Sequence, residues 1–205
     1  MGYVMAILGA YLLGCSNMAV YLAKRKRVNL SGGSGNPGKS NATLLMGWRA
    51  GAIVGIHDIG KGVLAVLLAE LLFPDLACIG AVAGVACVLG HIFPVFMKFR
   101  GGKGFASYLG MTLALNWKFA LIILAVVVVV TLITDYIVVG TVTTVVSVPV
   151  AMGFLRHSVL LVAILCVATA VILYKHRENY VRIWNRTEIG LSSAFKGGKR
   201  TDKRK

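Results

Sequence analysis

Acidic residues are scarce in this chain of 205 residues, which has 7 Asp and Glu against 22 Lys and Arg, a formal net charge of +15. Charged residues of both signs make up only 14% of the sequence, whereas a soluble domain carries about 25%. The low total charge excludes an ordinary soluble domain, and the shortage of carboxylates disfavours a site for a divalent cation. Because 58% of the residues are hydrophobic, the composition predicts an integral membrane protein.

Cysteine pairs of the C-x-x-C type are also missing. The four cysteines are Cys15, Cys78, Cys87 and Cys166, and each lies inside an apolar segment. Since free cysteine packs readily into apolar cores, we interpret all four as core residues. The sequence therefore offers neither a disulfide framework nor a zinc site, and we expect no bound metal.

Long apolar stretches take up most of the chain. Four are clear and a fifth is slightly shorter, while a further region, 105–133, is interrupted by Asn116, Trp117 and Lys118. A membrane helix needs roughly 20 apolar residues, so the clear stretches are long enough to span a bilayer. The five stretches are approximately 3–23, 51–73, 76–97, 136–155 and 158–174.

The distribution of basic residues sets the topology. Cytoplasmic loops of membrane proteins are enriched in Lys and Arg, and this chain has basic segments at 24–49, at 98–103 and from Lys175 onward. All three lie on one side only if 105–133 crosses the membrane twice. We therefore predict an all-α, compact bundle of about seven transmembrane helices, with the N-terminus outside and the C-terminus in the cytoplasm. A five-span alternative, with all of 105–133 on the cytoplasmic side, places the loops identically.

A single transmembrane domain accounts for most of the chain. We expect it to cover residues 1–190, and we expect 191–205 to be a basic cytoplasmic tail without fixed structure. Basic residues beside a membrane attract anionic lipid, at about 1 kcal/mol each. Attraction to membrane lipid explains this tail and the basic run 24–27 better than nucleic-acid binding does, and we expect no nucleic-acid partner.

Glycine, amide, hydroxyl and cationic groups gather in three polar segments at the predicted cytoplasmic ends of the helices. The first reads GGSGNPGKSN over 32–41, and its residues 33–40 fit the P-loop pattern G-x-x-x-x-G-K-[ST]. A true P-loop follows a buried strand, whereas this segment follows a membrane helix. A glycine turn that leads into a helix N-terminus, capped by Asn36 with Pro37 at the first helical position, can nevertheless bind phosphate. Ser34 adds a hydroxyl donor.

The second polar segment, 90–107, contains KFRGGKG, in which Arg100 and Lys103 flank paired glycines. Glycines allow close approach of the backbone, and the two cations can neutralise a phosphate dianion. The third polar segment, 175–188, has an amphipathic interfacial helix as its competing interpretation. Its acid–base and amide groups include His176, Asn179 and Glu188.

Two charged residues lie inside the second apolar stretch. Asp58 and Lys61 are three positions apart and can pair on one face of a helix. Charges inside a membrane are energetically unfavourable, so their presence favours a function. His91 ends the third apolar stretch, where a structural role is the commoner explanation.

Together these motifs resemble the bacterial acyl-phosphate-dependent glycerol-3-phosphate acyltransferases, the PlsY family. The family's G-S-G-N loop, D-x-x-K-G element, long G-H-x-F-P to G-G-K-G-x-A segment and H-R-x-N to Glu segment occur here in the same order. They cover residues 33–41, 58–62, 90–106 and 176–188, within a resemblance that extends over about 7–190.

The resemblance implies transfer of a fatty acyl group from acyl-phosphate to the 1-hydroxyl of glycerol-3-phosphate, giving lysophosphatidic acid and phosphate. That reaction is the first acylation step of phospholipid synthesis, and the resemblance implies that it needs no cofactor and no metal. It also implies a multi-pass enzyme of the bacterial cell membrane with its active site facing the cytoplasm. Two alternatives stay open: a divergent paralogue with another acceptor, and a membrane anion transporter.

The resemblance also assigns roles to individual residues. It implies catalytic roles for Ser34, Lys103, His176 and Asn179. It implies substrate or phosphate binding by Gly35, Asn36, Gly38, Asn41, Arg100, Gly101, Gly102 and Glu188. It implies supporting roles for Asp58, Lys61 and His91. Because family members carry Arg at the position of Leu44, we predict that Lys39 supplies the missing charge.

Overall fold

Helices make up all the regular structure in the described residues, 1–33 and 35–192, of this computed structural model. The predicted all-α fold is therefore confirmed. Ser34, a predicted catalytic residue, and 193–205, most of the predicted tail, lie outside the described residues. The elements are α1 (Gly2–Gly14), α2 (Met18–Lys26), α3 (Lys39–Met46), α4 (Trp48–Leu72), α5 (Ile79–Ile92), η1 (Val95–Met97), α6 (Phe105–Leu115), α7 (Trp117–Thr134), α8 (Ile137–Arg156), α9 (Val159–Lys175) and α10 (Arg177–Trp184).

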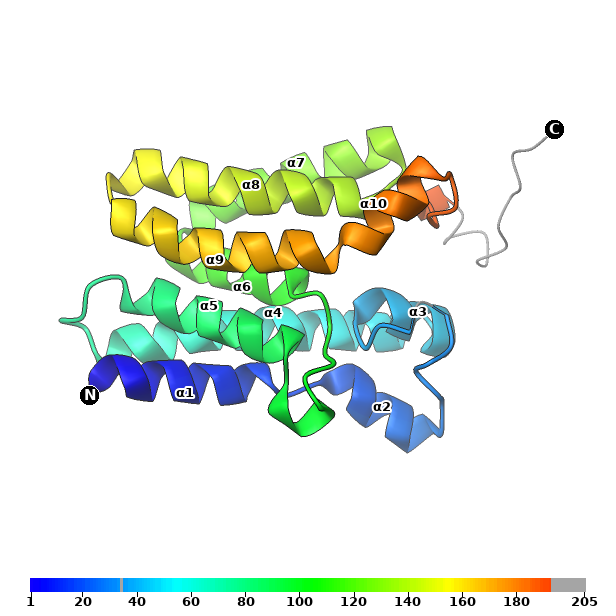
Figure 1. Cartoon of the computed structure of the whole chain (residues 1–205), viewed down its shortest axis with the longest axis horizontal. Helices are drawn as coiled ribbons and strands as arrows, with labels where there is room; N and C mark the ends of the chain where they lie inside the picture. The colour runs from blue at the N-terminus through cyan, green and yellow to red at the C-terminus, as the bar shows by residue number, and fades with distance from the viewer. Residues whose placement is uncertain (34, 193–205) are drawn as a thin grey trace.

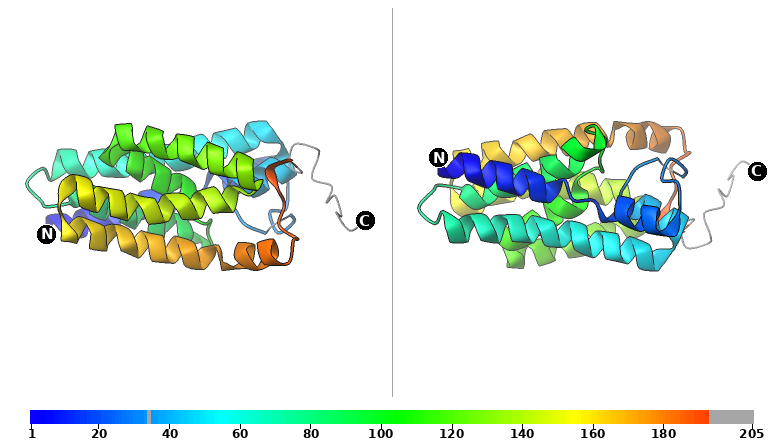
Figure 2. Two further views of the ribbon diagram at one scale, coloured as in Figure 1. Left: turned by 90° about the horizontal axis from the view of Figure 1, so that it is seen from above. Right: turned by 90° about the horizontal axis from the view of Figure 1, so that it is seen from below.

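The long helices run side by side along one direction and form a bundle (Figures 1 and 2). Within the described residues, five spans are long and apolar enough to cross a membrane, with α1 and α2 forming one of them. The bent pair α9 and α10 makes a sixth if it is counted as one span, and α6 is a shorter apolar helix. These segments are consistent with about seven spans, while the number of crossings and the orientation stay predictions.

Residues 105–133 form two helices rather than one. Helix α6 ends at Leu115, and the side-chain oxygen of Asn116 then caps α7 by accepting from the Phe119 N–H at 3.0 Å. Both helices run along the bundle instead of lying across one end (Figures 1 and 2). This arrangement argues against the alternative in which all of 105–133 lies on the cytoplasmic side, while the seven-span count stays a prediction.

Small residues let neighbouring helices approach closely. A Cβ on Gly14 of α1 would meet the carbonyl oxygen of Cys87 in α5, and one on Gly90 of α5 would meet that of Tyr11 in α1. Helices α4 and α6 meet in the same way at Gly110. Because lipid provides little hydrophobic force between helices, such close packing is what holds a membrane bundle together.

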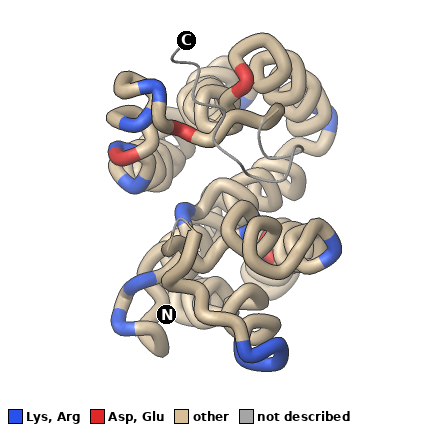
Figure 3. Tube along the Cα trace, turned by 90° about the vertical axis from the view of Figure 1, so that its right-hand side faces the viewer, with Lys and Arg blue, Asp and Glu red and all other residues tan. Residues whose placement is uncertain are grey.

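One end of the bundle, the right-hand end in Figure 1, carries α2, α3 and α10. We call it the polar end. Viewed from that side, Lys and Arg are more common along the chain than Asp and Glu (Figure 3). The loop between α2 and α3 and the segment from α9 into α10 reach this end, and the loop between η1 and α6 meets them at a cavity.

Candidate active site

A cavity of about 270 Å³ brings the three polar segments together at the polar end. Gly35 and Asn36 line it from the first segment, and Gly101 lines it from the second. Its charged lining residues are Arg100, Lys103, Lys175, Arg177, Arg182 and Glu178. Five cations therefore face a single carboxylate, an imbalance that a phosphate dianion would correct.

The loop that carries Lys103 is held against the end of α5. The Gly101 N–H donates to the Ile92 carbonyl and the Gly102 N–H donates to the His91 carbonyl, each at 3.1 Å. A Cβ on Gly101 would meet the His91 carbonyl oxygen, and one on Gly102 would meet the His91 ring. Because neither position has room for a side chain, the paired glycines place Lys103 at a fixed point beside the cavity.

A chain of polar side chains orients Lys103. Its ammonium donates to the side-chain oxygen of Asn179, and the Asn179 amide donates to Glu188 at 2.5 Å. The other oxygen of Glu188 accepts from Arg182 Nε at 2.5 Å. Burial, with the nearby Arg182 charge, lowers the pKa of Lys103, because both penalise its charged form. A bound anion would relieve that penalty, so the site favours a negatively charged ligand.

His176 lies between α9 and α10 and is buried. Its Nδ1 is 2.8 Å from the Ile172 carbonyl oxygen, which requires Nδ1 to carry the proton and leaves Nε2 as an acceptor. Burial lowers the pKa of His176 to about 4, so the ring is neutral at pH 7. The charges of Lys103 and Glu188 both act on it, which places it beside the polar chain, although it does not line the cavity.

The first polar segment folds differently from the sequence prediction. We expected Asn36 to cap a helix that begins at Pro37, but α3 begins at Lys39, and Gly38 is its N-cap residue. The Asn36 carbonyl instead accepts from the Gly38 N–H at 2.8 Å, and this tight turn delays the helix. Asn17 also fixes the turn, since its side chain donates to the Pro37 carbonyl at 3.1 Å.

Asn41 and Lys39 lie outside the cavity lining. Asn41 is fully buried, and its amide donates to the Leu30 carbonyl at 2.9 Å, so it holds the loop in place from behind. Lys39 is exposed, and its aliphatic stem packs over Gly55 of α4. The predicted contact of Lys39 with phosphate therefore rests on the sequence alone.

Asp58, Lys61 and His91 form a buried ionic cluster inside the bundle. The Lys61 ammonium lies 3.1 Å from the Asp58 carboxylate and 2.8 Å from His91 Nδ1. It also donates to the carbonyls of Gly14 and Ser16, at 2.9 and 2.7 Å. The cluster thus joins α4, α5 and the break after α1, and through His91 it supports the loop of Lys103 without lining the cavity.

Three of the cations that line the cavity were not predicted to belong to the site: Lys175, Arg177 and Arg182. We interpreted Lys175 and Arg177 as part of the basic signal for topology. Its spacing could have identified Arg182 as a site residue, because Arg182 lies three positions after Asn179 and therefore on the same face of α10.

The family model for glycerol-3-phosphate acyltransferase matches residues 4–186. The chain belongs to the glycerol-3-phosphate acyltransferase family. It is 35% identical over 204 residues to glycerol-3-phosphate acyltransferase 1 of Oceanobacillus iheyensis, covering 95% of this chain and 98% of that protein. It is 38% identical over 192 residues to the glycerol-3-phosphate acyltransferase of Clostridioides difficile, covering 91% and 94%.

Two solved structures of this acyltransferase family have the same fold. One is the glycerol 3-phosphate form of PlsY, an integral membrane glycerol 3-phosphate acyltransferase, with a TM-score of 0.88, 32% identity and coverage of 94% of this chain and 97% of that chain. The other is its lysophosphatidic acid form, with a TM-score of 0.85, 31% identity and coverage of 95% and 99%. The chain is therefore a multi-pass integral membrane acyltransferase, as its motifs predicted.

Proposed function

We propose that this acyltransferase moves a fatty acyl group from acyl-phosphate to the 1-hydroxyl of glycerol-3-phosphate, releasing lysophosphatidic acid and inorganic phosphate. The observation that carries the proposal is the cavity in which five cations face one carboxylate. Both substrates of this reaction are phosphate anions, and their charge matches the excess of cations. The relatives described above are named for glycerol-3-phosphate, which supports it as the acceptor.

The proposed reaction asks the protein for positioning and for charge stabilisation. Acyl-phosphate is a mixed anhydride, so attack by the hydroxyl oxygen breaks the bond between the acyl carbon and the phosphate oxygen. Phosphate leaves with the electron pair and can accept the proton of the hydroxyl, so that the step needs no external base. The protein must hold two anions in register and stabilise developing negative charge, and these effects account for most of the catalysis expected here.

Individual residues fit these tasks. Lys103 supplies a fixed positive charge beside the phosphate, and Asn179 and Glu188 keep it aligned. His176, buried beside the chain of polar side chains, keeps its sequence-based role in orienting the acceptor. Backbone groups of Gly35 and Gly101 line the cavity and can approach a phosphate closely. Ser34, between Gly33 and Gly35, keeps its sequence-based role as a donor.

The proposed location follows from the same layout. We place the enzyme in the bacterial cell membrane with the polar end in the cytoplasm, because the basic loops gather there. The phosphate groups of both substrates would enter from water, and the fatty chain of the donor would remain in the bilayer. An anion transporter would need unpaired polar groups through the bundle, whereas the charges of the buried cluster are paired with one another.

The test uses the purified chain with synthetic palmitoyl phosphate and radiolabelled glycerol-3-phosphate. We expect labelled lysophosphatidic acid and an equal amount of released phosphate. Palmitoyl coenzyme A should give no product, because the proposed donor is an acyl-phosphate. Comparable rates with the coenzyme A donor, or no product with the acyl-phosphate, would refute the proposal. Uptake of glycerol-3-phosphate into proteoliposomes without acylation would favour the transporter.

A further inference from the structure

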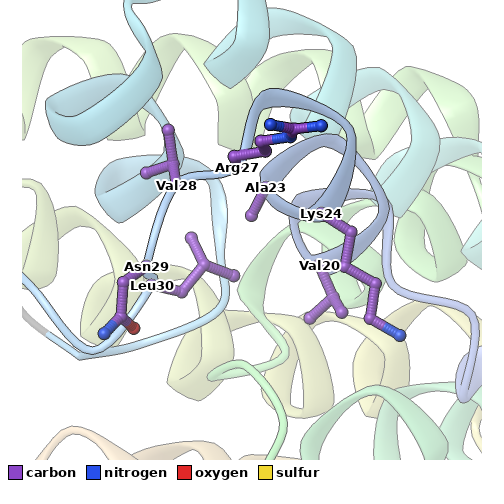
Figure 4. A pocket seen from close by; sticks show the side chains of 7 residues that line it. All are labelled: Val20, Ala23, Lys24, Arg27, Val28, Asn29 and Leu30. Atoms are coloured by element: carbon purple, nitrogen blue, oxygen red, sulfur yellow. The ribbon is translucent and has the colours of Figure 1, made fainter.

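A second hollow lies at the polar end, between α2 and the chain that follows it (Figure 4). Its volume is about 480 Å³, and all of its lining comes from residues 20–30. The aliphatic side chains of Val20, Val28 and Leu30 line it together with the cations Lys24 and Arg27. No lining residue is acidic, so the hollow combines an apolar wall with uncompensated positive charge.

Lys24 and Arg27 have no polar side-chain partner in the described part of the chain. Both are exposed, and neither forms an ion pair or a side-chain hydrogen bond with another described residue. Their neighbour Lys26 differs, since its ammonium donates to the Met46 carbonyl at 3.4 Å. Two cations are therefore available for a ligand at the hollow.

The hollow adjoins the loop that leads into the candidate active site. Leu30 lines the hollow and also packs against the buried cluster of Ala19, Ala42 and Val54. Asn17 caps α2 by accepting from the Val20 N–H at 3.0 Å, and it also holds the carbonyl of Pro37, which lines the active-site cavity. The loop 28–37 therefore has one end at the hollow and the other at the cavity.

We propose that this hollow binds one phospholipid with an anionic headgroup. The headgroup lies at the basic end of α2, where Lys24 and Arg27 supply positive charge from two sides, and an acyl chain lies against Val20, Val28 and Leu30. Helices α1 and α2 together have the length and composition of a membrane span, which brings the basic end of α2 to the level of the headgroups. A free phosphate would leave the apolar wall uncovered, whereas a lipid matches both the charges and the wall.

The site is separate from the proposed acyl-transfer cavity and does not depend on that function. Its direct consequence is mechanical, because the lipid would brace the loop 28–37 from the outer side. None of the residues involved lies in the cavity around Lys103.

Native mass spectrometry of the purified chain, titrated with phosphatidylglycerol, tests the site with two double variants matched in charge. Lys24→Gln with Arg27→Gln removes the lining cations, and Arg25→Gln with Lys26→Gln removes two charges from the same helix outside the lining. We expect the first pair to weaken phosphatidylglycerol binding roughly tenfold or more, and the second less than about twofold. Equal losses in the two pairs would mean diffuse attraction and would overturn the proposal.

A second experiment keeps the charges and fills the space. Val28→Trp should weaken phosphatidylglycerol binding although Lys24 and Arg27 remain, and binding of phosphatidylcholine should change in none of the variants. If Val28→Trp lowers the unfolding temperature, Val20→Phe replaces it. Unchanged phosphatidylglycerol binding in the filled variant, or its displacement by millimolar inorganic phosphate, would overturn the proposal.

Discussion

The buried ionic cluster and the cavity around Lys103 are both built from charged side chains, but their charge balance is opposite. In the cluster, the Lys61 ammonium forms an ion pair with Asp58 and hydrogen bonds with His91 and two backbone carbonyls, so groups of the protein itself compensate its positive charge. In the cavity, five cations share one lining carboxylate. The cluster therefore holds helices together, whereas the cavity keeps an excess of positive charge although Arg182 is also paired with Glu188, and that excess favours an anionic ligand.

Buried charges in this bundle serve stability as well as function. A charged residue inside a membrane segment favours a function, yet Asp58 and Lys61 lie behind the cavity and support it. The residues that face the cavity lie in loops and at helix ends. The sequence indicated phosphate binding for Arg100 and Lys103, whereas it indicated only topology for Lys175 and Arg177. Pairing within the protein, more than depth in the membrane, separates the two groups.

The largest predicted effect is on the stability of the cluster. Asp58→Asn leaves the Lys61 ammonium buried beside a neutral amide, and breaking a buried pair costs about 3–5 kcal/mol. We expect a large fall in the unfolding temperature of the purified protein. Asp75→Asn, in the exposed loop between α4 and α5, is the control and should stay within about 0.5 kcal/mol. An Asp58→Asn protein as stable as the parent would show that the buried cluster does not stabilise the bundle.

For a residue of the cavity we expect the opposite pattern, a large loss of activity with little loss of stability. Lys103→Met keeps the aliphatic stem and removes the charge, and losing one such stabilising contact lowers turnover about 10²–10³-fold, or about 2.7–4 kcal/mol. The unfolding temperature should hardly change. Lys98→Met removes an exposed cation that does not line the cavity, and its kcat/KM should stay near the parent value. Unfolding of Lys103→Met, or equal losses in both variants, would contradict a ligand-directed role for Lys103.

Much of the fold could be predicted from the sequence because its signals are local. Apolar length predicted the helices, Asn116 marked the break between α6 and α7, and basic loops predicted that the three polar segments share one end. The start of α3 was wrong, because the turn at Asn36 and the bond from Asn17 depend on contacts outside the segment.

The connections inside the site were beyond sequence reasoning. Lys103 and Asn179 are 76 positions apart, and no local pattern shows that they are bonded. His91 was expected to be structural, but its place beneath Gly102 depends on how α5 ends and how the following loop folds back. Such links appear only when the bundle has assembled.

Gly102 tests whether the cluster and the cavity are coupled. A Cβ there would meet the ring of His91, so Gly102→Ala should push the Lys103 loop outward at about 1–3 kcal/mol. We expect lower kcat/KM together with a modest fall in unfolding temperature. Gly60→Ala on α4 is the matched control, because nothing lies within 4 Å of the added Cβ. Parent-like kinetics in Gly102→Ala would show that the two regions are independent.

The smallest predicted effect is at the turn between α7 and α8, which holds the chain after Glu188. The Asp135 carbonyl accepts from the Leu191 N–H at 2.7 Å, and its carboxylate accepts from the N–H and the hydroxyl of Ser192, each at 2.8 Å. Asp135 has φ of 65°, which Asn tolerates well. Asp135→Asn therefore removes one acceptor without adding backbone strain.

Because Glu188 orients Asn179, loosening this segment should disturb the alignment of Lys103 more than the stability of the bundle. A single hydrogen bond of this kind contributes about 0.5–1.5 kcal/mol, so KM for glycerol-3-phosphate should rise a few-fold in Asp135→Asn while the unfolding temperature stays nearly constant. Ser192→Ala, which removes only the hydroxyl bond, should show the same direction with a smaller size. A double-mutant cycle that combines Asp135→Asn with Glu188→Gln is the decisive experiment. If Asp135 acts through Glu188, the two effects on KM are less than additive. Full additivity would show that the turn does not act through Glu188.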